Sequence, residues 1–328
     1  MTQLGEFALI ARYFTRGCAE RQGVGDDCAL IDVDSRTLAV TTDMLLEGVH
    51  FLPDADPEAL GHKALAVNLS DLAAAGARPR CFLLGIAMAQ ADEQWLAAFS
   101  RGLFALAEQH ACALVGGDTS RSLPSDRGRT GPVWINIVAI GEVDRACCRG
   151  RSGARPGDDI WVSGRLGEAA LALAVRRGKV DIPSPAREQC FRRMDRPEPR
   201  VALGLALCGL ASAAIDLSDG LVGDLGHVLE RSGVGAVVDW PQVPRADVFA
   251  RLDVALQQQL VLAGGDDYEL LFTARPADRQ AIGALSCDAV PLTRIGRIDA
   301  AAGLRILDGS GAPIKATLHA FDHFAAEA

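Results

Sequence analysis

The sequence predicts a two-domain protein of the α/β or α+β class. Strand-like apolar runs alternate with helix-like segments along the whole of the 328 residues, which is typical of these classes. A chain of this length more often forms two domains than one. Between residues 141 and 158, arginines and glycines crowd together without hydrophobic periodicity. We therefore expect one domain over residues 1–148 and a second over residues 149–328.

In the first half, helix caps and apolar periodicity define the expected elements. Asp56 followed by Pro57 is a typical helix start, because aspartate accepts hydrogen bonds from the first turn and proline fits its first position. Asp92 begins a second helix in the same way. The strands are apolar runs bounded by turn residues. We expect strands over residues 27–32, 37–42, 81–89, 113–115 and 133–140, and helices from residue 57 to before 76 and from 92 through 106.

The second half repeats this alternation. We expect strands over residues 159–163, 213–215, 236–240, 268–273 and 290–298, and helices over residues 166–177, 200–210 and 221–231. The longest uncharged stretch, residues 201–215, is interrupted by Gly204 and Gly209. It is too short to cross a membrane and indicates a buried helix that runs into a strand.

The net charge and the cysteines indicate which partners and which cellular compartment to expect. A formal net charge of −9 argues against nucleic acid as a main partner. Nine cysteines without a Cys-x-x-Cys motif cannot all form internal disulfides, and we expect buried, reduced thiols in the cytoplasm. The N-terminus carries no signal peptide. We therefore expect a cytoplasmic protein without membrane or nucleic-acid partners.

Six short turns combine aspartates with glycine, serine or threonine, and most of them follow a strand-like run. Small residues let the backbone approach a ligand closely, and carboxylates suit hard cations such as Mg²⁺. Six such turns at strand ends indicate a ligand crevice that holds metal ions and a polyphosphate. The turns are Gly25-Asp26-Asp27, Thr41-Thr42-Asp43, Asn68-Leu69-Ser70-Asp71, Gly116-Gly117-Asp118-Thr119, Asp216-Leu217-Ser218-Asp219-Gly220 and Gly264-Gly265-Asp266-Asp267.

Each of these turns taken alone has a structural explanation of equal weight. Asp216 and Ser218 could cap the helix that begins near Leu221, and Asp71 could be a solvated carboxylate near a helix end. His50 follows the Asp43 turn, and a structural role and a substrate contact are equally open for it. Neither a phosphate-binding Lys loop nor a dinucleotide-binding glycine fingerprint is present.

Taken in order, the motifs resemble the thiamine-monophosphate kinase family, of the superfamily that includes aminoimidazole ribonucleotide synthetase and selenophosphate synthetase. The resemblance covers nearly the whole chain. It is carried by Gly5-Glu6-Phe7, Gly23–Asp27, Thr42-Asp43 with Gly48–Phe51, Lys63–Ala74, Gly116–Thr119, Arg151–Ala154 with Pro156–Asp158, Ile215–Leu221 and Gly264–Leu270.

The resemblance implies an aminoimidazole ribonucleotide synthetase-like fold. In that fold an N-terminal α/β domain dimerises through its sheet, and a C-terminal α/β domain packs against it and completes the active site. The resemblance also implies the reaction of ATP with thiamine phosphate to give ADP and thiamine diphosphate. The expected partners are thus ATP, thiamine monophosphate, several Mg²⁺ ions and a second copy of the chain.

Site roles follow from the same resemblance, position by position. The implied Mg²⁺ ligands are Asp27, Thr41, Thr42, Asp43, Asp71, Asp118, Asp216 and Asp219. The implied ATP contacts are Gly117, Asp118, Arg151 and Ser218. The implied thiamine phosphate contacts are His50, Asp266 and Phe321. No side chain is expected to act as a general base, because metal ions and positioning drive the transfer.

Two positions depart from the family pattern. Asp266 stands where the family usually has glutamate, and Phe321 stands where relatives often carry tyrosine or tryptophan. Two other hypotheses remain at this point. The chain could be another ATP-using synthetase of the superfamily that activates an amide or selenide, or a non-catalytic nucleotide- or metal-binding protein.

Overall fold

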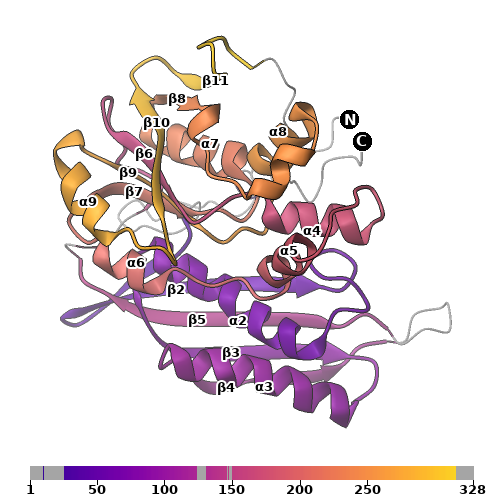
Figure 1. Cartoon of the computed structure of the whole chain (residues 1–328). Coiled ribbons are helices and arrows are strands. Elements are labelled where there is room, and N and C mark those ends of the chain that lie inside the picture. Colours follow the sequence, from indigo (N-terminus) through magenta and orange to yellow (C-terminus); the bar gives the residue numbers. More distant parts are fainter. Residues whose placement is uncertain (1–9, 11–25, 124–130, 146, 148–149, 315–328) are drawn as a thin grey trace, which may run out of the picture.

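The strands of the protein form two separate sheets, one from each half of the chain. The computed structural model describes residue 10 and residues 26–123, 131–145, 147 and 150–314. Helices lie between the two sheets and around the second one (Figure 1). This mixed α/β arrangement confirms the predicted class.

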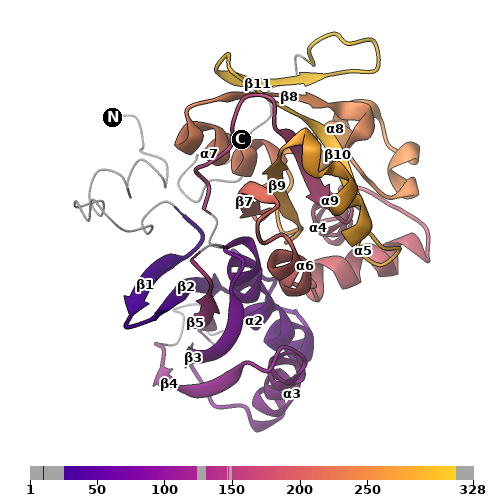
Figure 2. The ribbon, with the colours of Figure 1, turned by 90° about the vertical axis from the view of Figure 1, so that its left-hand side faces the viewer.

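The first sheet has five strands in the order β1-β2-β5-β3-β4. Neighbours are antiparallel except β3 and β4, which run parallel because the helix α3 connects them. Helices α2 (Pro57–Ala74) and α3 (Glu93–Gln109) cover one face (Figure 2). The strands are β1 (Ala29–Val33), β2 (Arg36–Leu46), β3 (Arg78–Met88), β4 (Ala113–Arg121) and β5 (Trp134–Val143).

No described helix covers the other face of this sheet. Alternate residues of the antiparallel strands point towards it, and large apolar side chains among them stay exposed. Trp134 is 50% exposed and Met44 is 52% exposed. Ile31, Val33 and Leu83 lie exposed on the same face. A contiguous apolar surface of this kind indicates an interaction site.

The second sheet has six strands in the order β11-β8-β10-β6-β9-β7. Its neighbours are antiparallel except the parallel pair β8 and β11. The strands are β6 (Asp159–Ser163), β7 (Ala211–Asp216), β8 (Gly235–Asp239), β9 (Leu270–Ala274), β10 (Leu292–Asp299) and β11 (Gly303–Leu307). The helices are α4 (Glu168–Arg176), α5 (Ala186–Asp195), α6 (Val201–Ala206), α7 (Leu221–Ser232), α8 (Val254–Leu262) and α9 (Arg279–Leu285).

Helix α2 joins the two halves of the molecule. It packs against α3 and the first sheet on one side and against α6 and β7 on the other. Of its 18 residues, 14 are buried, so it lacks the one-sided apolar stripe of a surface helix. A Cβ at Gly204 of α6 would lie 2.1 Å from the carbonyl oxygen of Ala73, which shows how closely the two helices approach. The residues that α2 carries are therefore held against both sheets.

Most predicted elements are confirmed, with shifted ends. Asp56 caps α2 by accepting from the amide of Ala59, and Asp92 caps α3. The strand predicted over residues 113–115 was too short, because pairing with β3 carries β4 on to Arg121. The helix predicted over residues 200–210 ends earlier, at Ala206. The prediction omitted α5, α8, α9 and β11.

The expectation of reduced thiols was wrong for two cysteines. Cys147 and Cys208 form a disulfide with Cα atoms 4.6 Å apart, although 61 residues separate them in sequence. Local sequence cannot show this proximity, since the path of the chain between the two sheets creates it. Five other described cysteines are not paired with one another in disulfides: Cys28, Cys81, Cys112, Cys190 and Cys287. No helix in the described ranges is long and apolar enough to cross a membrane.

Candidate metal centre and adjoining pocket

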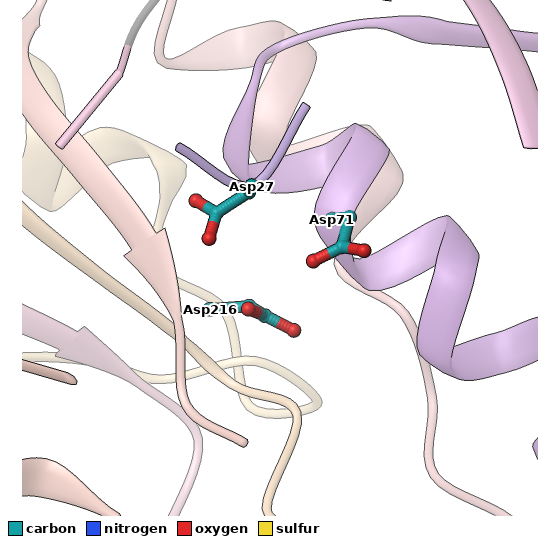
Figure 3. Close-up of side chains that lie close together, drawn as sticks. All are labelled: Asp27, Asp71 and Asp216. Carbon is teal, nitrogen blue, oxygen red and sulfur yellow. The ribbon is translucent and has the colours of Figure 1, made fainter. Parts of the chain in front are cut away.

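Three aspartates from distant parts of the chain converge at the junction of the two halves. Asp27 precedes β1, Asp71 lies in the last turn of α2, and Asp216 ends β7. Figure 3 shows their carboxylates facing a common space. One oxygen of each lies within 4.8 Å of those of the other two. Acidic oxygens gathered this closely, on two partly buried aspartates and one buried one, form a candidate site for hard cations.

Without a bound cation, burial and the neighbouring aspartates disfavour the ionised form of these carboxylates. Burial, followed by the charge of Asp27, raises the pKa of Asp216 to about 8. Burial, followed by the charges of Asp219 and Asp27, raises the pKa of Asp43 to about 6. The pKa of Asp71 is raised well above its usual range by burial and then by Asp43 and Asp216. The fold thus maintains a cluster that bound cations would stabilise.

Strand β2 and helix α2 position the N-terminal part of the cluster together. Alternation along β2 places Thr41 and Asp43 on the helix-covered face. The Thr41 hydroxyl donates to the carboxylate of Asp71, and the Asn68 side-chain oxygen accepts from the amide of Asp43 at 3.2 Å. Asp71 is therefore a partly buried carboxylate that β2 holds in place by a hydrogen bond, although it lies near a helix end.

The turn after β7 supplies the C-terminal part. Helix α7 begins at Leu221 with Gly220 as its N-cap and no side-chain hydrogen bond at the cap, so Asp216 and Ser218 do not cap it. Instead Asp224, one turn into α7, accepts from the amides of Asp219 and Gly220 at 3.1 and 3.0 Å. This leaves the carboxylate of Asp216 to face the cluster. The capping explanation for this turn was therefore wrong.

Arg151 is the cation that the described structure places beside the cluster. Its guanidinium donates to Asp27 Oδ1 from Nη2 at 2.6 Å and from Nε at 3.1 Å. Its backbone amide donates to Asp26 at 2.8 Å. Burial raises the pKa of Asp27 even though Arg151 opposes the shift. One arginine thus balances only part of the negative charge.

A pocket lies between the two halves of the molecule beside the cluster. His50 and Phe51 from the segment after β2, with Lys63 of α2, form one wall. Leu173 of α4, Met194 of α5 and Asp266 line the pocket from the second half of the chain. Apolar side chains share the lining with six charged ones, Asp56, Lys63, Arg176, Arg177, Asp195 and Asp266. Such a mixed lining suits a small ligand that has both organic and charged parts.

Hydrogen bonds fix the polar groups of this pocket. His50 Nδ1 accepts from the amide of Leu46 at 3.0 Å, so a neutral imidazole carries its proton on Nε2. The amide of Asp266 donates to the Ser218 carbonyl at 2.8 Å, which ties the pocket to the turn after β7. The pKa of the Tyr268 hydroxyl is raised well above its usual range by burial and then by Asp266, Asp43 and Asp216. Pocket and cluster are therefore adjoining parts of one site.

Two implied ligands lie away from the cluster. The side chain of Thr42 points to the open face of the sheet, where it accepts from Asn136 at 3.1 Å. Asp118 lies on the edge strand β4, three strand positions from β2, or about 14 Å at the usual spacing. Neighbouring Gly117 cannot carry a side chain, because a Cβ would lie 1.9 Å from the Leu84 carbonyl oxygen. Phe321 lies outside the described residues.

Four residues that hold the site were not predicted from the sequence. Asn68 and Lys63 lie on α2, Asp224 lies on α7, and Tyr268 follows the last acidic turn. A lysine and an asparagine inside an apolar helical run could have indicated Lys63 and Asn68, because such residues are seldom buried without a partner. Asp224 carried no local signal, since an aspartate early in a helix is common.

The raised pKa values predict that the metal-free protein loses stability as the pH rises from 5 to 8. A carboxyl whose pKa is raised on folding stabilises the fold fully below its unfolded value near 3.9. That contribution is lost as the pH rises through the folded values, about 6 for Asp43 and about 8 for Asp216. Saturating Mg²⁺ should reverse most of the loss at pH 8. Thermal melts in EDTA and in Mg²⁺ at constant ionic strength measure both effects. A melting temperature that rises with pH in EDTA would contradict the prediction.

Comparison with known proteins places this site in context. Residues 25–143 match the family model of the AIR synthase related protein N-terminal domain, and residues 155–309 match its C-terminal domain. A thiamine-monophosphate kinase from Salmonella typhimurium is 43% identical over 330 residues, which cover 98% of each chain. The crystal structure of thiamine-monophosphate kinase from Stenotrophomonas maltophilia is 43% identical, with a TM-score of 0.77 over 95% of this chain and 98% of that one. AaThiL complexed with AMPPCP and TMP is 31% identical, with a TM-score of 0.83 over 98% and 97%.

Proposed function

The chain belongs to the thiamine-monophosphate kinase family, built from the two AIR synthase related domains, and we propose that it transfers the γ-phosphoryl group of ATP to thiamine monophosphate. The product is thiamine diphosphate. The main support for this proposal is that the cluster of aspartates adjoins a pocket that can hold an organic ligand. The cluster suits the reacting phosphates, and the pocket suits the rest of the acceptor.

The acidic cluster fits Mg²⁺. Opposite ligands of an octahedral Mg²⁺ lie about 4.2 Å apart, and this ion usually keeps several waters. Three carboxylate oxygens that lie within 4.8 Å of one another can therefore hold hydrated Mg²⁺ shared with phosphates. Asp27, Asp71 and Asp216 would hold the ions, with Asp43 and Asp219 nearby. Bound Mg²⁺ would supply positive charge for the phosphates.

The nature of the acceptor explains why carboxylates dominate the site. A phosphate monoester has a second pKa near ~6, so its oxygens are already nucleophilic at pH 7 without a base. The obstacle is repulsion, which at ~4 Å costs roughly 4 kcal/mol for each like-charged pair at an effective dielectric constant of 20. A site for this reaction needs neutralisation and in-line alignment. Its residues therefore bind and orient the phosphates, and none removes a proton.

Arg151 and Ser218 are the residues beside the cluster that we assign to ATP. The Arg151 guanidinium pairs with Asp27 and can also reach a phosphate oxygen, since it carries five donors. Ser218 lies in the turn that holds Asp216 and Asp219. Gly117 and Asp118 lie on β4 away from the cluster, so we assign them to a more distant part of ATP. Thr41 acts through Asp71, and Thr42 would contact an ion only through its main chain.

We assign His50 and Asp266 to the organic part of thiamine phosphate, because both line the pocket. Phe321, outside the described residues, keeps its proposed stacking role from the resemblance.

Three broader features are also part of the proposal. The open sheet face with Trp134 and Met44 supports a homodimer that buries this face. A cytoplasmic setting is also proposed: five described cysteines form no disulfide, whereas the Cys147–Cys208 disulfide is unusual for that compartment. A domain boundary at residue 148 is supported by the gap between β5, which ends at Val143, and β6, which begins at Asp159.

Radiolabelled ATP tests the reaction and its route. With the γ-phosphate labelled, we expect the label in thiamine diphosphate when thiamine monophosphate and Mg²⁺ are present, and no transfer when Mg²⁺ is omitted. We also expect no label on the protein without the acceptor, because the candidate carboxylates are occupied with metal ions and cannot also accept phosphate. Labelled protein under that condition would contradict direct transfer. Absence of transfer to any of several phosphomonoesters would favour a binding protein instead.

A further inference from the structure

Helix α2 buries a lysine at the wall of the pocket. Lys63 is only 4% exposed, and its neighbours along the helix are mostly buried apolar residues. Removing an ammonium group from water costs several kcal/mol, and a buried ion pair is often no more stable than an apolar replacement. Stability alone is therefore a weak explanation for a lysine at this position.

The partner of Lys63 belongs to the other half of the molecule. Lys63 Nζ donates to Asp266 Oδ2 at 2.8 Å, and the Tyr268 hydroxyl donates to Asp266 Oδ1 at 3.2 Å. Both carboxylate oxygens are thus held. The backbone of Asp266 is fixed as well, since it adopts a left-handed conformation with φ of 70° and its amide binds the Ser218 carbonyl.

The two side chains of this ion pair differ in their exposure to solvent. The Lys63 side chain is 5% exposed, whereas the Asp266 side chain is 36% exposed. Both residues line the pocket that also contains Phe51 and Met194. Each carboxylate oxygen can accept about two hydrogen bonds, so Asp266 keeps free acceptor positions after binding Lys63 and Tyr268. Lys63 is therefore the buried member of the pair, and the carboxylate of Asp266 is the member that is accessible to a ligand in the pocket.

A fixed acceptor of this kind recognises an N–H donor on the ligand. An aromatic ring that carries an amino group can donate to Asp266, whereas the same ring with a carbonyl oxygen places a second acceptor against the carboxylate. Sites built to bind a hydrogen-bonding group reject analogues without it strongly, because their own polar group is left unpaired. The orientation of Asp266 therefore decides how well the pocket distinguishes the two rings.

We propose that Lys63 is a positioning residue that sets the selectivity of the pocket for an amino-substituted heteroaromatic ring by fixing Asp266 across the junction of the two sheets. The inference rests on the proposed function, because the aminopyrimidine ring of thiamine monophosphate is the ligand concerned. Lys63 itself acts only through Asp266 and does not touch the reacting phosphates.

Steady-state kinetics of Lys63→Met with two acceptors test the proposal. The acceptors are thiamine monophosphate and its analogue with a carbonyl oxygen in place of the ring amino group. We expect KM for thiamine monophosphate to rise about tenfold, with kcat and KM for ATP within twofold of wild type. The ratio of kcat/KM between the two acceptors should fall by a similar factor. Lys63→Arg should restore most of the wild-type ratio. Lys179→Met, at an exposed lysine, should leave both KM and the ratio unchanged.

The outcomes separate this inference from the proposed function. If wild type uses thiamine monophosphate and Lys63→Met keeps KM and acceptor ratio within twofold, the inference is overturned and the function stands. A wild-type protein that does not phosphorylate thiamine monophosphate overturns both. If Lys63→Met fails to fold in thermal melts, Tyr268→Phe tests the same carboxylate through its other oxygen. An acceptor ratio reduced about threefold in Tyr268→Phe supports the inference, and an unchanged ratio overturns it.

Discussion

Replacing Asp71 with asparagine is expected to lower kcat about a thousandfold while the protein stays folded. Asp71 is one of the three clustered carboxylates, and an amide of the same shape lacks the charge that Mg²⁺ prefers. A thousandfold loss corresponds to about 4 kcal/mol of transition-state stabilisation. Asp43→Asn should lose turnover in the same way, because Asp43 lies close enough to the cluster for its pKa to be raised by it.

The loss of activity in Asp71→Asn should not be accompanied by a loss of stability. Burial and the neighbouring aspartates raise the pKa of Asp71, which shows that the metal-free fold opposes its charge. The asparagine variant should therefore melt no lower than wild type in EDTA at pH 8. Rates at saturating ATP and Mg²⁺, with melts in EDTA, measure both quantities. Asp288→Asn, at an exposed aspartate of the second half, is the matched control. Near-normal rates of both Asp71→Asn and Asp43→Asn at saturating Mg²⁺ would show that the metal-site assignment is wrong.

The second large effect concerns Arg151, where we expect both stability and activity to fall. Arg151 and Asp27 form a pair whose side chains are 14% and 4% exposed. Removing one partner of a buried pair leaves the other charge uncompensated and typically costs ~3 kcal/mol. Arg151→Met should therefore unfold at a lower urea concentration in EDTA. It should also lose about a hundredfold in kcat/KM for ATP, since a charge-assisted donor to the phosphates is lost.

Magnesium distinguishes the two roles of Arg151. A cation bound beside Asp27 replaces the missing positive charge, so added Mg²⁺ should stabilise Arg151→Met more than wild type. Urea denaturation with and without Mg²⁺ measures the difference. Arg251→Met removes an exposed arginine and should match wild type in every measurement. Equal stability of Arg151→Met and wild type in EDTA would show that the ion pair with Asp27 carries no weight in the fold.

Much of the fold could be predicted because its signals are local. Asp56 and Asp92 cap α2 and α3 as expected, since a capping side chain needs only the next three residues. The length of β4 could not be predicted in this way. Its residues after Val115 are small and polar, and pairing with β3 makes them a strand. Strand formation there depends on a neighbour, and propensity alone is a poor guide.

The candidate site shows the same division. The acidic turns pointed to Asp27, Asp71 and Asp216, and the structure brings these three carboxylates together. The same motifs also pointed to Asp118, which the sheet order places on an edge strand away from them. A motif fixes the chemistry that a turn can carry, but the position of its strand in the sheet decides which turns share a ligand.

The sequence by itself determined the α/β class, the caps and the carboxylate-rich chemistry, because those preferences act between residues a few positions apart. Only the tertiary structure decided which charges meet. Arg151 contacts Asp27 across 124 residues, Lys63 contacts Asp266 across 203, and Cys147 bonds to Cys208. The physical reason is that α2 packs between the two sheets. Its burial on both sides brings the two halves of the chain to one site.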